Sequence, residues 1–161
     1  MIIAFLVAAL SIAGLNLPAQ NLKGLPRAFP ADMAQHRAII IVTFSQAASD
    51  QGAKWTRKLR EKQPELGVTI YQIAILEDVP PMVRFLVLSA MRRGIPKELH
   101  DNFWIATSST KEWQEVTGSQ SLGQAHVFLL EDRSQITWHS DGAFSKPTFQ
   151  GLLAALSARK D

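Results

Sequence analysis

Residues 38–44, Ala-Ile-Ile-Ile-Val-Thr-Phe, form an unbroken apolar and mostly β-branched run that leads into Ser-Gln-Ala-Ala-Ser-Asp-Gln-Gly at residues 45–52. Such a run is typical of a strand in a parallel sheet that is covered on both faces. The next segment, residues 47–62, is predicted to be a helix that stops before Pro64. Together they predict a buried strand followed by a crossover helix, the building unit of an α/β domain.

The rest of the chain continues this alternation. Strands are predicted at residues 68–75, 103–107, 125–131 and 135–139, the last two joined by a tight turn. Helices are predicted at residues 78–93, 109–118 and 145–158, and the second of these opens with a capping box formed by Ser109 and Glu112. Residues 16–37 predict only a loose lead-in, with a short edge strand near residues 15–22. This order predicts an α/β fold with a central mixed sheet, a parallel core, a C-terminal antiparallel hairpin and helices on both faces.

The composition indicates one globular domain without thiol chemistry. The chain has 161 residues, a net charge of +3 and no cysteine. That length is enough to bury a core without covalent staples. The absence of cysteine excludes disulfides and thiolate metal sites. The basic residues are scattered and form no stripe with interleaved aromatic residues, so nucleic acid is not an expected partner.

The first 15 residues are almost wholly apolar and carry no charge. Their length suits a signal peptide or a short membrane anchor, which leaves residues 16–161 as a single domain. A gene start assigned too late and a buried first element are the two alternatives. Because no arginine-rich presequence is present, we expect export in a bacterium, to the periplasm or tethered to the inner membrane, rather than import into mitochondria.

The hairpin segment Phe128-Leu-Leu-Glu-Asp-Arg-Ser-Gln-Ile-Thr-Trp138 resembles the late hairpin of thioredoxins, peroxiredoxins and their cytochrome-maturation relatives. The resemblance implies a thioredoxin-like fold, with residue 125 at the place of the cis-proline and residues 49–52 at the place of the Cys-x-x-Cys. A serine there supplies neither the nucleophile nor the leaving group of thiol–disulfide exchange. The resemblance thus implies a redox-inactive pseudo-active site made of Ser49, Asp50, Gln51, Gly52, Ala125 and His126.

A second resemblance is carried by residues 75–78, by the helix at residues 82–93 with the segment to Ile105, and by residues 125–131, 136–138 and Gly142. These segments are similar to the mitochondrial F-type ATP synthase assembly factor family. The similarity implies a non-redox chaperone that associates with the inner membrane and helps subunit a join the ring of subunit c. The chain departs from the family pattern at His126 and Thr137, where the family tends to show tyrosine and arginine.

The pseudo-active site leaves an alternative function open. Amides at the helix start beside Ser49 can hold an anion or a carbonyl group, although Ser49 and Asp50 are equally suited to cap the helix. The resemblance places His126 near Ser49, so an enzyme or a carrier of a small ligand is the alternative hypothesis. No catalytic residue is assigned, because the chain has no Gly-x-Ser-x-Gly elbow. An aspartate adjacent to the serine in sequence is also poorly placed to orient a histidine.

No metal site and no cofactor are predicted. The four histidines, His36, His100, His126 and His139, follow no recognisable ligand spacing. His126 and His139 can approach each other across the predicted hairpin, but surface or strand-end histidines are the default interpretation.

The helix at residues 82–93 is apolar on almost every side. Most such helices are buried; if this one lies outside the sheet, it presents a patch suited to an apolar client. Trp55, one turn into the preceding helix, is a core residue by default and a further peptide contact in the alternative. The predicted partner-binding residues are Met82, Phe85, Leu86, Met91, Arg84, Arg92 and Trp55. The sequence thus predicts a binding or assembly protein without turnover, with a protein client such as a subunit of a membrane complex.

Overall fold

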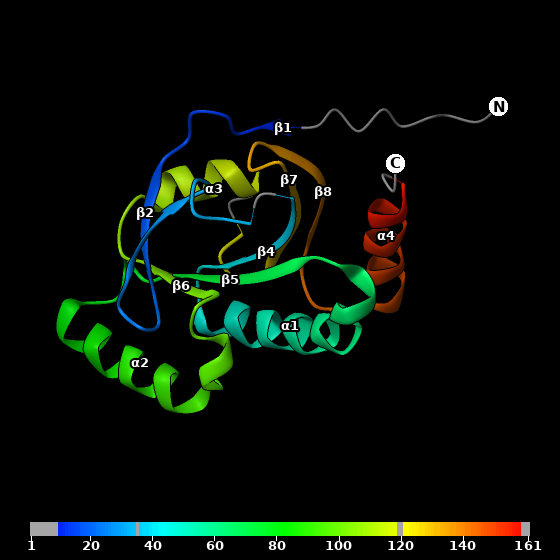
Figure 1. The fold of residues 1–161 in the computed structure, drawn as a ribbon. Helices are drawn as coiled ribbons and strands as arrows, with labels where there is room; N and C mark the ends of the chain where they lie inside the picture. The colour runs from blue at the N-terminus through cyan, green and yellow to red at the C-terminus, as the bar shows by residue number, and fades with distance from the viewer. Residues whose placement is uncertain (1–9, 35, 119–120, 159–161) are drawn as a thin grey trace.

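The computed structural model, which describes residues 10–34, 36–118 and 121–158, is built around the predicted buried strand (Figure 1). β4 (Arg37–Thr43) pairs in parallel with β5 (Thr69–Ile75) and antiparallel with β7 (His126–Glu131). Residues 38–42 of β4 are completely buried, because strands flank β4 on both sides and side chains cover both of its faces. The predicted central strand is confirmed.

The strands form one mixed sheet in the order β1-β8-β7-β4-β5-β6-β2-β3. β6 (Phe103–Ala106) extends the parallel core, and β8 (Gln135–Asp141) returns antiparallel to β7. At the other edge, β2 (Leu17–Asn21) and β3 (Pro26–Phe29) form a hairpin, and β2 pairs with β6. The expected mixed sheet is confirmed. The short strand expected near residues 15–22 is present as β2, but it lies inside the sheet, and β3 takes the edge position instead of a loose lead-in.

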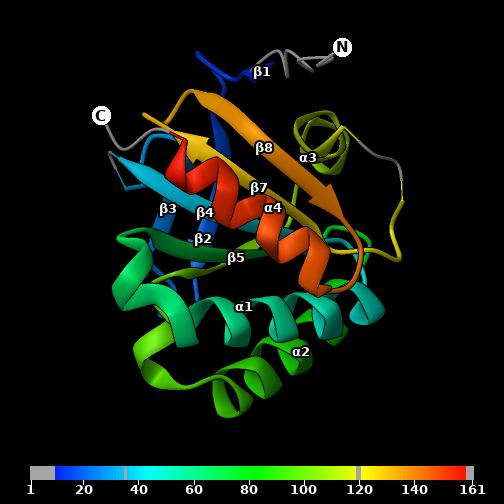
Figure 2. The same ribbon diagram turned by 90° about the vertical axis from the view of Figure 1, so that its right-hand side faces the viewer.

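Helices cover both faces of the sheet, as Figure 1 and Figure 2 show. α1 (Gln46–Leu66), α2 (Pro81–Gly94) and α4 (Lys146–Ser157) lie on one face, and α3 (Thr110–Thr117) lies on the other. A short 3-10 turn, Lys97–Leu99, connects α2 to β6. The side chains of successive residues in β4 point alternately toward the two helical layers.

The two layers have separate cores. Ile41 packs with Trp55 of α1 and Leu152 of α4. Ile40, one residue earlier, packs on the opposite side with the core that contains Trp113 of α3 and Phe128. Side chains that look equally apolar in the sequence are thereby sorted to different faces.

α1 differs from its prediction at both ends. Its N-cap is Ser45, whose hydroxyl accepts from the Ala48 amide at 3.2 Å. The helix passes through Pro64 and ends at Gly67, which adopts the left-handed conformation with φ of 62°. A proline so close to the end of a helix removes one of its last hydrogen bonds, a loss that α1 tolerates because its preceding turns pack on the sheet.

Residues 10–15, the last part of the predicted signal peptide or anchor, lie against the domain. β1 (Leu10–Ser11) pairs with β8, and the Ile12 side chain is buried in the core that contains Ile40. The folded domain therefore includes residues 10–15. The remainder of the predicted signal peptide or anchor, residues 1–9, lies outside the described residues. Within residues 10–34, 36–118 and 121–158, no helix combines the length and apolarity needed to cross a membrane.

The predicted capping box at the start of α3 is wrong. Ser109 has a left-handed backbone with φ of 65°, and its side chain makes no capping hydrogen bond. The Thr110 amide instead donates to Glu77 Oε2 at 2.8 Å, and the Thr110 hydroxyl donates to the same oxygen. These two hydrogen bonds, with a smaller contribution from Arg84, hold the pKa of Glu77 below its usual value of 4.5.

Candidate functional site

Residues 49–52 lie within the first two turns of α1 and do not offer free helix-start amides. The Ser49 amide donates to the Ser45 carbonyl at 2.9 Å, inside the helix. The Ser49 hydroxyl lies 3.2 Å from Thr43 Oγ1, and Gln46 Nε2 donates to Asp50 Oδ1 at 3.2 Å. Since Ser45 caps the helix, the expected cap or anion site at Ser49 and Asp50 is wrong.

Gln51 joins α1 to the start of β7. Its Oε1 accepts from the buried Ala125 amide at 2.9 Å. Among the described residues, Phe29–Pro30 carries the single cis peptide bond, so the bond preceding Ala125 is trans. A proline at residue 125 would have no amide hydrogen to donate. Gln51 therefore satisfies a buried amide that a proline at residue 125 would lack.

Gly52 lies where α1 packs closely against the sheet. A Cβ built on it would lie 3.1 Å from Thr43 Cγ2, 3.2 Å from Ile41 Cγ2 and 3.1 Å from Gln72 Nε2. This position has no room for a side chain without a shift of the helix or of its neighbours. Gly52 thus allows α1 to pack closely against β4 and β5.

His126 does not approach Ser49, and that expectation is wrong. His126 is paired with Val42, whose side chain belongs to the face opposite α1, whereas the adjacent residues Ala125 and Val127 pack on the α1 face. Alternation along a strand therefore directs the His126 ring away from Ser49. On its own face, the ring is completely buried and contacts Asp141 at 2.7 Å from Nδ1.

Trp55 is a core residue and not a partner contact. Its indole Nε1 donates to the Gly142 carbonyl at 3.0 Å, and its ring packs edge-on against Phe144 with centroids 5.1 Å apart. The side chain is 1% exposed. The segment after β8 covers it, which a local sequence pattern does not reveal.

α2 lies outside the sheet and contains no buried residue. Its outward side chains Met82, Phe85 and Leu86 are 86%, 67% and 65% exposed. They stand at positions i, i+3 and i+4, which places them together on one face of the helix. The helix therefore presents an apolar surface to solvent, which is the second of the two interpretations of the sequence; the default interpretation of a buried helix is wrong.

The remaining predicted contacts of α2 are engaged within the fold. Met91 is partly buried and packs against the core under α2. Arg84 Nη2 donates to the Val79 carbonyl at 3.0 Å, and Arg92 Nε donates to the Leu22 carbonyl at 2.9 Å. These three residues hold α2 in place, and the outward apolar face consists of Met82, Phe85 and Leu86 together with Val83.

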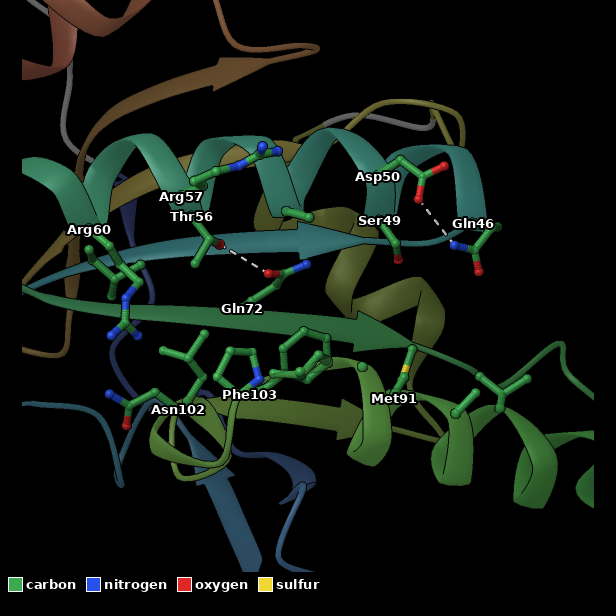
Figure 3. Close-up of a pocket in the computed structure, with 18 of the residues that line it drawn as sticks. Gln46, Ser49, Asp50, Thr56, Arg57, Arg60, Gln72, Met91, Asn102 and Phe103 are labelled. Atoms are coloured by element: carbon green, nitrogen blue, oxygen red, sulfur yellow. Dashed lines mark hydrogen bonds between the residues drawn. The ribbon is translucent and has the colours of Figure 1, made fainter.

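A groove of about 950 Å³ runs between α1 and α2 (Figure 3). Its floor is formed by Ile70 and Gln72 of β5 and by Phe103 of β6, and most of its wall is apolar. Gln72 Oε1 accepts from the Thr56 hydroxyl at 3.0 Å, as the dashed line in Figure 3 shows. Further polar residues at the wall and rim are Ser49, Asp50, Arg57, Arg60 and Asn102.

Most of these groove residues could not be predicted from the sequence. Gln72 carried the available signal, because it is the one amide side chain in a strand of mainly apolar residues. Thr56 and Arg60 look like ordinary exposed helix positions, and only the packing of α1 beside α2 brings them to the groove.

Solved structures share this architecture at low sequence identity. A SCO1/SenC family lipoprotein from Bacillus anthracis has a TM-score of 0.61 and 12% identity, over 91% of this chain and 94% of its own. An exposed lipoprotein thioredoxin from Streptococcus pneumoniae has a TM-score of 0.58 and 11% identity, over 86% and 98%. Peroxiredoxin Q from Xanthomonas campestris has a TM-score of 0.58 and 16% identity, over 96% and 99%. The fold is thioredoxin-like.

The predicted fold is thus confirmed, and at these identities the similarity establishes the fold alone. No family model and no curated protein matches the sequence. Because the chain contains no cysteine, this thioredoxin-like domain has no thiol for disulfide exchange.

Proposed function

We propose that this protein is a redox-inactive, thioredoxin-like binding protein that holds an apolar segment of a partner protein without turnover. The observation that carries the proposal is the outward face of α2, where Met82, Phe85 and Leu86 are mostly exposed on one side of a single helix. Single exposed apolar side chains are common, but grouped ones mark interaction surfaces.

The outward face of α2 does not contribute to the packing of the domain's own core. α2 attaches to the sheet through Val87, Leu88 and Met91, which pack on the core containing Phe103. The outward side chains lie on the other side of the helix and add nothing to that core. A helix that is apolar on both sides is suited to pack on its own domain with one side and on a partner with the other. Methionine and phenylalanine at the exposed positions adapt to varied apolar surfaces.

The partner is proposed to be a subunit of a membrane complex under assembly. The most specific form of this proposal names ATP synthase as the complex. This part rests on the resemblance of residues 75–105 and 125–142 to the ATP synthase assembly factors. Export to the periplasm or attachment to the inner membrane belongs to the same proposal. Apolar segments of membrane subunits are the clients that an exposed apolar face would shield before insertion or assembly.

Site-specific photo-crosslinking in cells of the source organism tests the binding surface. A photoreactive phenylalanine analogue at Phe85 is compared with the same analogue at Gln150, an exposed residue of α4 on a different side of the domain. We expect a discrete partner to be captured from residue 85 and not from residue 150. The purified partner should then bind the wild-type protein and lose affinity for Phe85→Asp and Leu86→Lys, both checked for native circular dichroism.

The outcomes separate the surface from the client. Capture of ATP synthase subunit a supports both parts of the proposal. A different membrane protein, captured from residue 85 and dependent on Phe85 and Leu86, supports the surface and excludes ATP synthase as client. Equal capture from residues 85 and 150, or unchanged affinity of the charged variants, refutes the surface.

The groove between α1 and α2 favours a second candidate, a carrier of a small apolar ligand. Its volume of about 950 Å³ lies within the range of small-molecule sites, and its lining is mainly apolar, as is usual for such sites. Ala53 lines the groove from α1 and is exposed, so Ala53→Trp would fill the space while leaving the outward face of α2 intact. Native mass spectrometry of protein purified from its own host should show a bound ligand that Ala53→Trp abolishes. A wild-type mass equal to that of the bare chain refutes the carrier function.

A further inference from the structure

Three side chains that can bind a metal ion meet at the end of the β7–β8 hairpin away from its turn. His126 is the first residue of β7, and the register pairs it with Asp141, the last residue of β8. His139 lies two residues before Asp141, so both project from the same face. Asp141 Oδ1 is 2.7 Å from His126 Nδ1 and 2.8 Å from His139 Nε2, and the three atoms lie within 4.8 Å of one another.

The His126 ring is held in one orientation. It is completely buried and packs edge-on against Phe44, with centroids 5.6 Å apart and planes at 71°. Its Nε2 lies 2.9 Å from the Ser121 carbonyl oxygen. A carbonyl oxygen only accepts, so Nε2 carries the hydrogen of this contact. Metal-binding histidines characteristically donate their second nitrogen in this way, which fixes the tautomer and aims the other nitrogen at the ion.

The contact between His126 Nδ1 and Asp141 Oδ1 joins two atoms that can each offer a lone pair. With the hydrogen on Nε2, a neutral His126 presents a lone pair at Nδ1. The carboxylate oxygen 2.7 Å away also offers only lone pairs. The two atoms are therefore close enough to share either a proton, carried by the ring or by the carboxyl group, or a metal ion. His139 Nε2 meets the same carboxylate oxygen and completes a set of two imidazoles and one carboxylate, which suits zinc and related ions.

The site can adjust to the bond lengths of such an ion. With bonds of about 2.0–2.2 Å, ligand atoms around a tetrahedral zinc ion lie about 3.3 Å apart. The carboxylate and His139 would thus move outward by roughly half an ångström. The side chains of His139 and Asp141 are 41% and 27% exposed, which gives them that freedom. Buried His126 supplies the rigid ligand, and a fourth coordination position is left on the solvent side.

The geometry points to a binding site for one divalent transition-metal ion, formed by His126 Nδ1, His139 Nε2 and Asp141 Oδ1. The site goes beyond the sequence-based expectation that no metal is bound. It is also independent of the proposed partner surface, because His126 lies on the face of the sheet opposite α1 and α2.

Calorimetric titration with ZnCl2 tests the inference on the full chain, purified without a polyhistidine tag and treated with chelator. We expect one ion per chain. His139→Ala and Asp141→Ala should each weaken the affinity by more than about 100-fold, because changes outside the ligands alone cost 10–100-fold. Both residues are partly exposed, so circular dichroism should stay native. His36→Ala removes an exposed histidine outside the cluster and should keep the wild-type affinity.

Two further measurements identify the kind of site. Co2+ should bind with visible absorption bands that His139→Ala abolishes, and MgCl2 should give no saturable binding, since magnesium prefers oxygen ligands. Absence of one-to-one Zn2+ binding would overturn the inference and leave the cluster as a hydrogen-bonded triad that shares protons. Wild-type affinity in both ligand variants, or equal affinity for Mg2+ and Zn2+, would overturn it as well.

Discussion

Replacing Gly52 with alanine tests how tightly α1 is held against the sheet at the pseudo-active site. The added methyl group would meet Thr43 Cγ2 at 3.1 Å, Ile41 Cγ2 at 3.2 Å and Gln72 Nε2 at 3.1 Å. The Gln72 amide can rotate away. The two methyl groups belong to buried β-branched residues of the central strand, whose side chains have little rotational freedom. The helix itself must therefore move away from β4.

The expected magnitude combines two opposing effects. In an open helical position, alanine in place of glycine stabilises by about 0.8–1 kcal/mol. Overpacking of a well-packed core typically costs about 1–3 kcal/mol. We therefore expect Gly52→Ala to lower the free energy of unfolding by about 0–2 kcal/mol. The same substitution at an open helical position would raise the free energy of unfolding.

Gly94→Ala provides the matched control. Gly94 is the last residue of α2, and a Cβ built on it meets no atom within 4 Å. This variant should gain up to about 1 kcal/mol. Urea unfolding followed by circular dichroism measures both variants, and the gap between them should be about 1–3 kcal/mol. Equal stability of the two variants with unchanged m-values would refute the close approach of α1 to β4.

Three further predictions concern single side chains. Gln51→Ala should lower the free energy of unfolding by about 1–3 kcal/mol, because the buried Ala125 amide loses its acceptor; Gln51→Glu, which keeps an acceptor oxygen, should retain more stability in the same urea assay. Glu77→Ala should be less stable than wild type near pH 7. Since the folded-state pKa of Glu77 is lowered, its contribution exists above the unfolded-state pKa and is lost as the pH falls through the folded-state pKa. The urea midpoints should therefore converge in acid, and a constant difference would contradict the capping role of Glu77 on α3. Phe85→Asp should leave the unfolding free energy within about 0.5 kcal/mol of wild type; a larger loss in thermal or urea unfolding would place Phe85 in the core instead of on a binding face.

Much of the fold could be predicted because its signals are local. The apolar run at residues 38–44 predicted a strand covered on both faces, and β4 is completely buried from residue 38 to residue 42. The turn at residues 132–134 separated two strands that do form a hairpin. Burial on both faces and tight reversal each leave a pattern within a few consecutive residues.

The candidate sites could be predicted only in part. The exposed apolar face of α2 was one of two interpretations of an apolar helix, and periodicity could not choose between them because both sides are apolar. The opposite directions of Ser49 and His126 depend on the register between β4 and β7. The groove depends on how α1 and α2 lie side by side, and its Gln72 carried the single local signal.

The sequence by itself determined the order of strands and helices, the absence of thiol chemistry and the apolar character of α2. These properties follow from residue types and from periods of two or 3.6 residues, which recur within one element. Tertiary structure decided which groups meet: the Gln51 side chain with the Ala125 amide across 74 residues, the Trp55 indole with the Gly142 carbonyl across 87 residues, and the His126 and Asp141 side chains across 15 residues. Such contacts depend on strand register and on the packing of layers, because a shift of one residue sends every side chain of a strand to the other face.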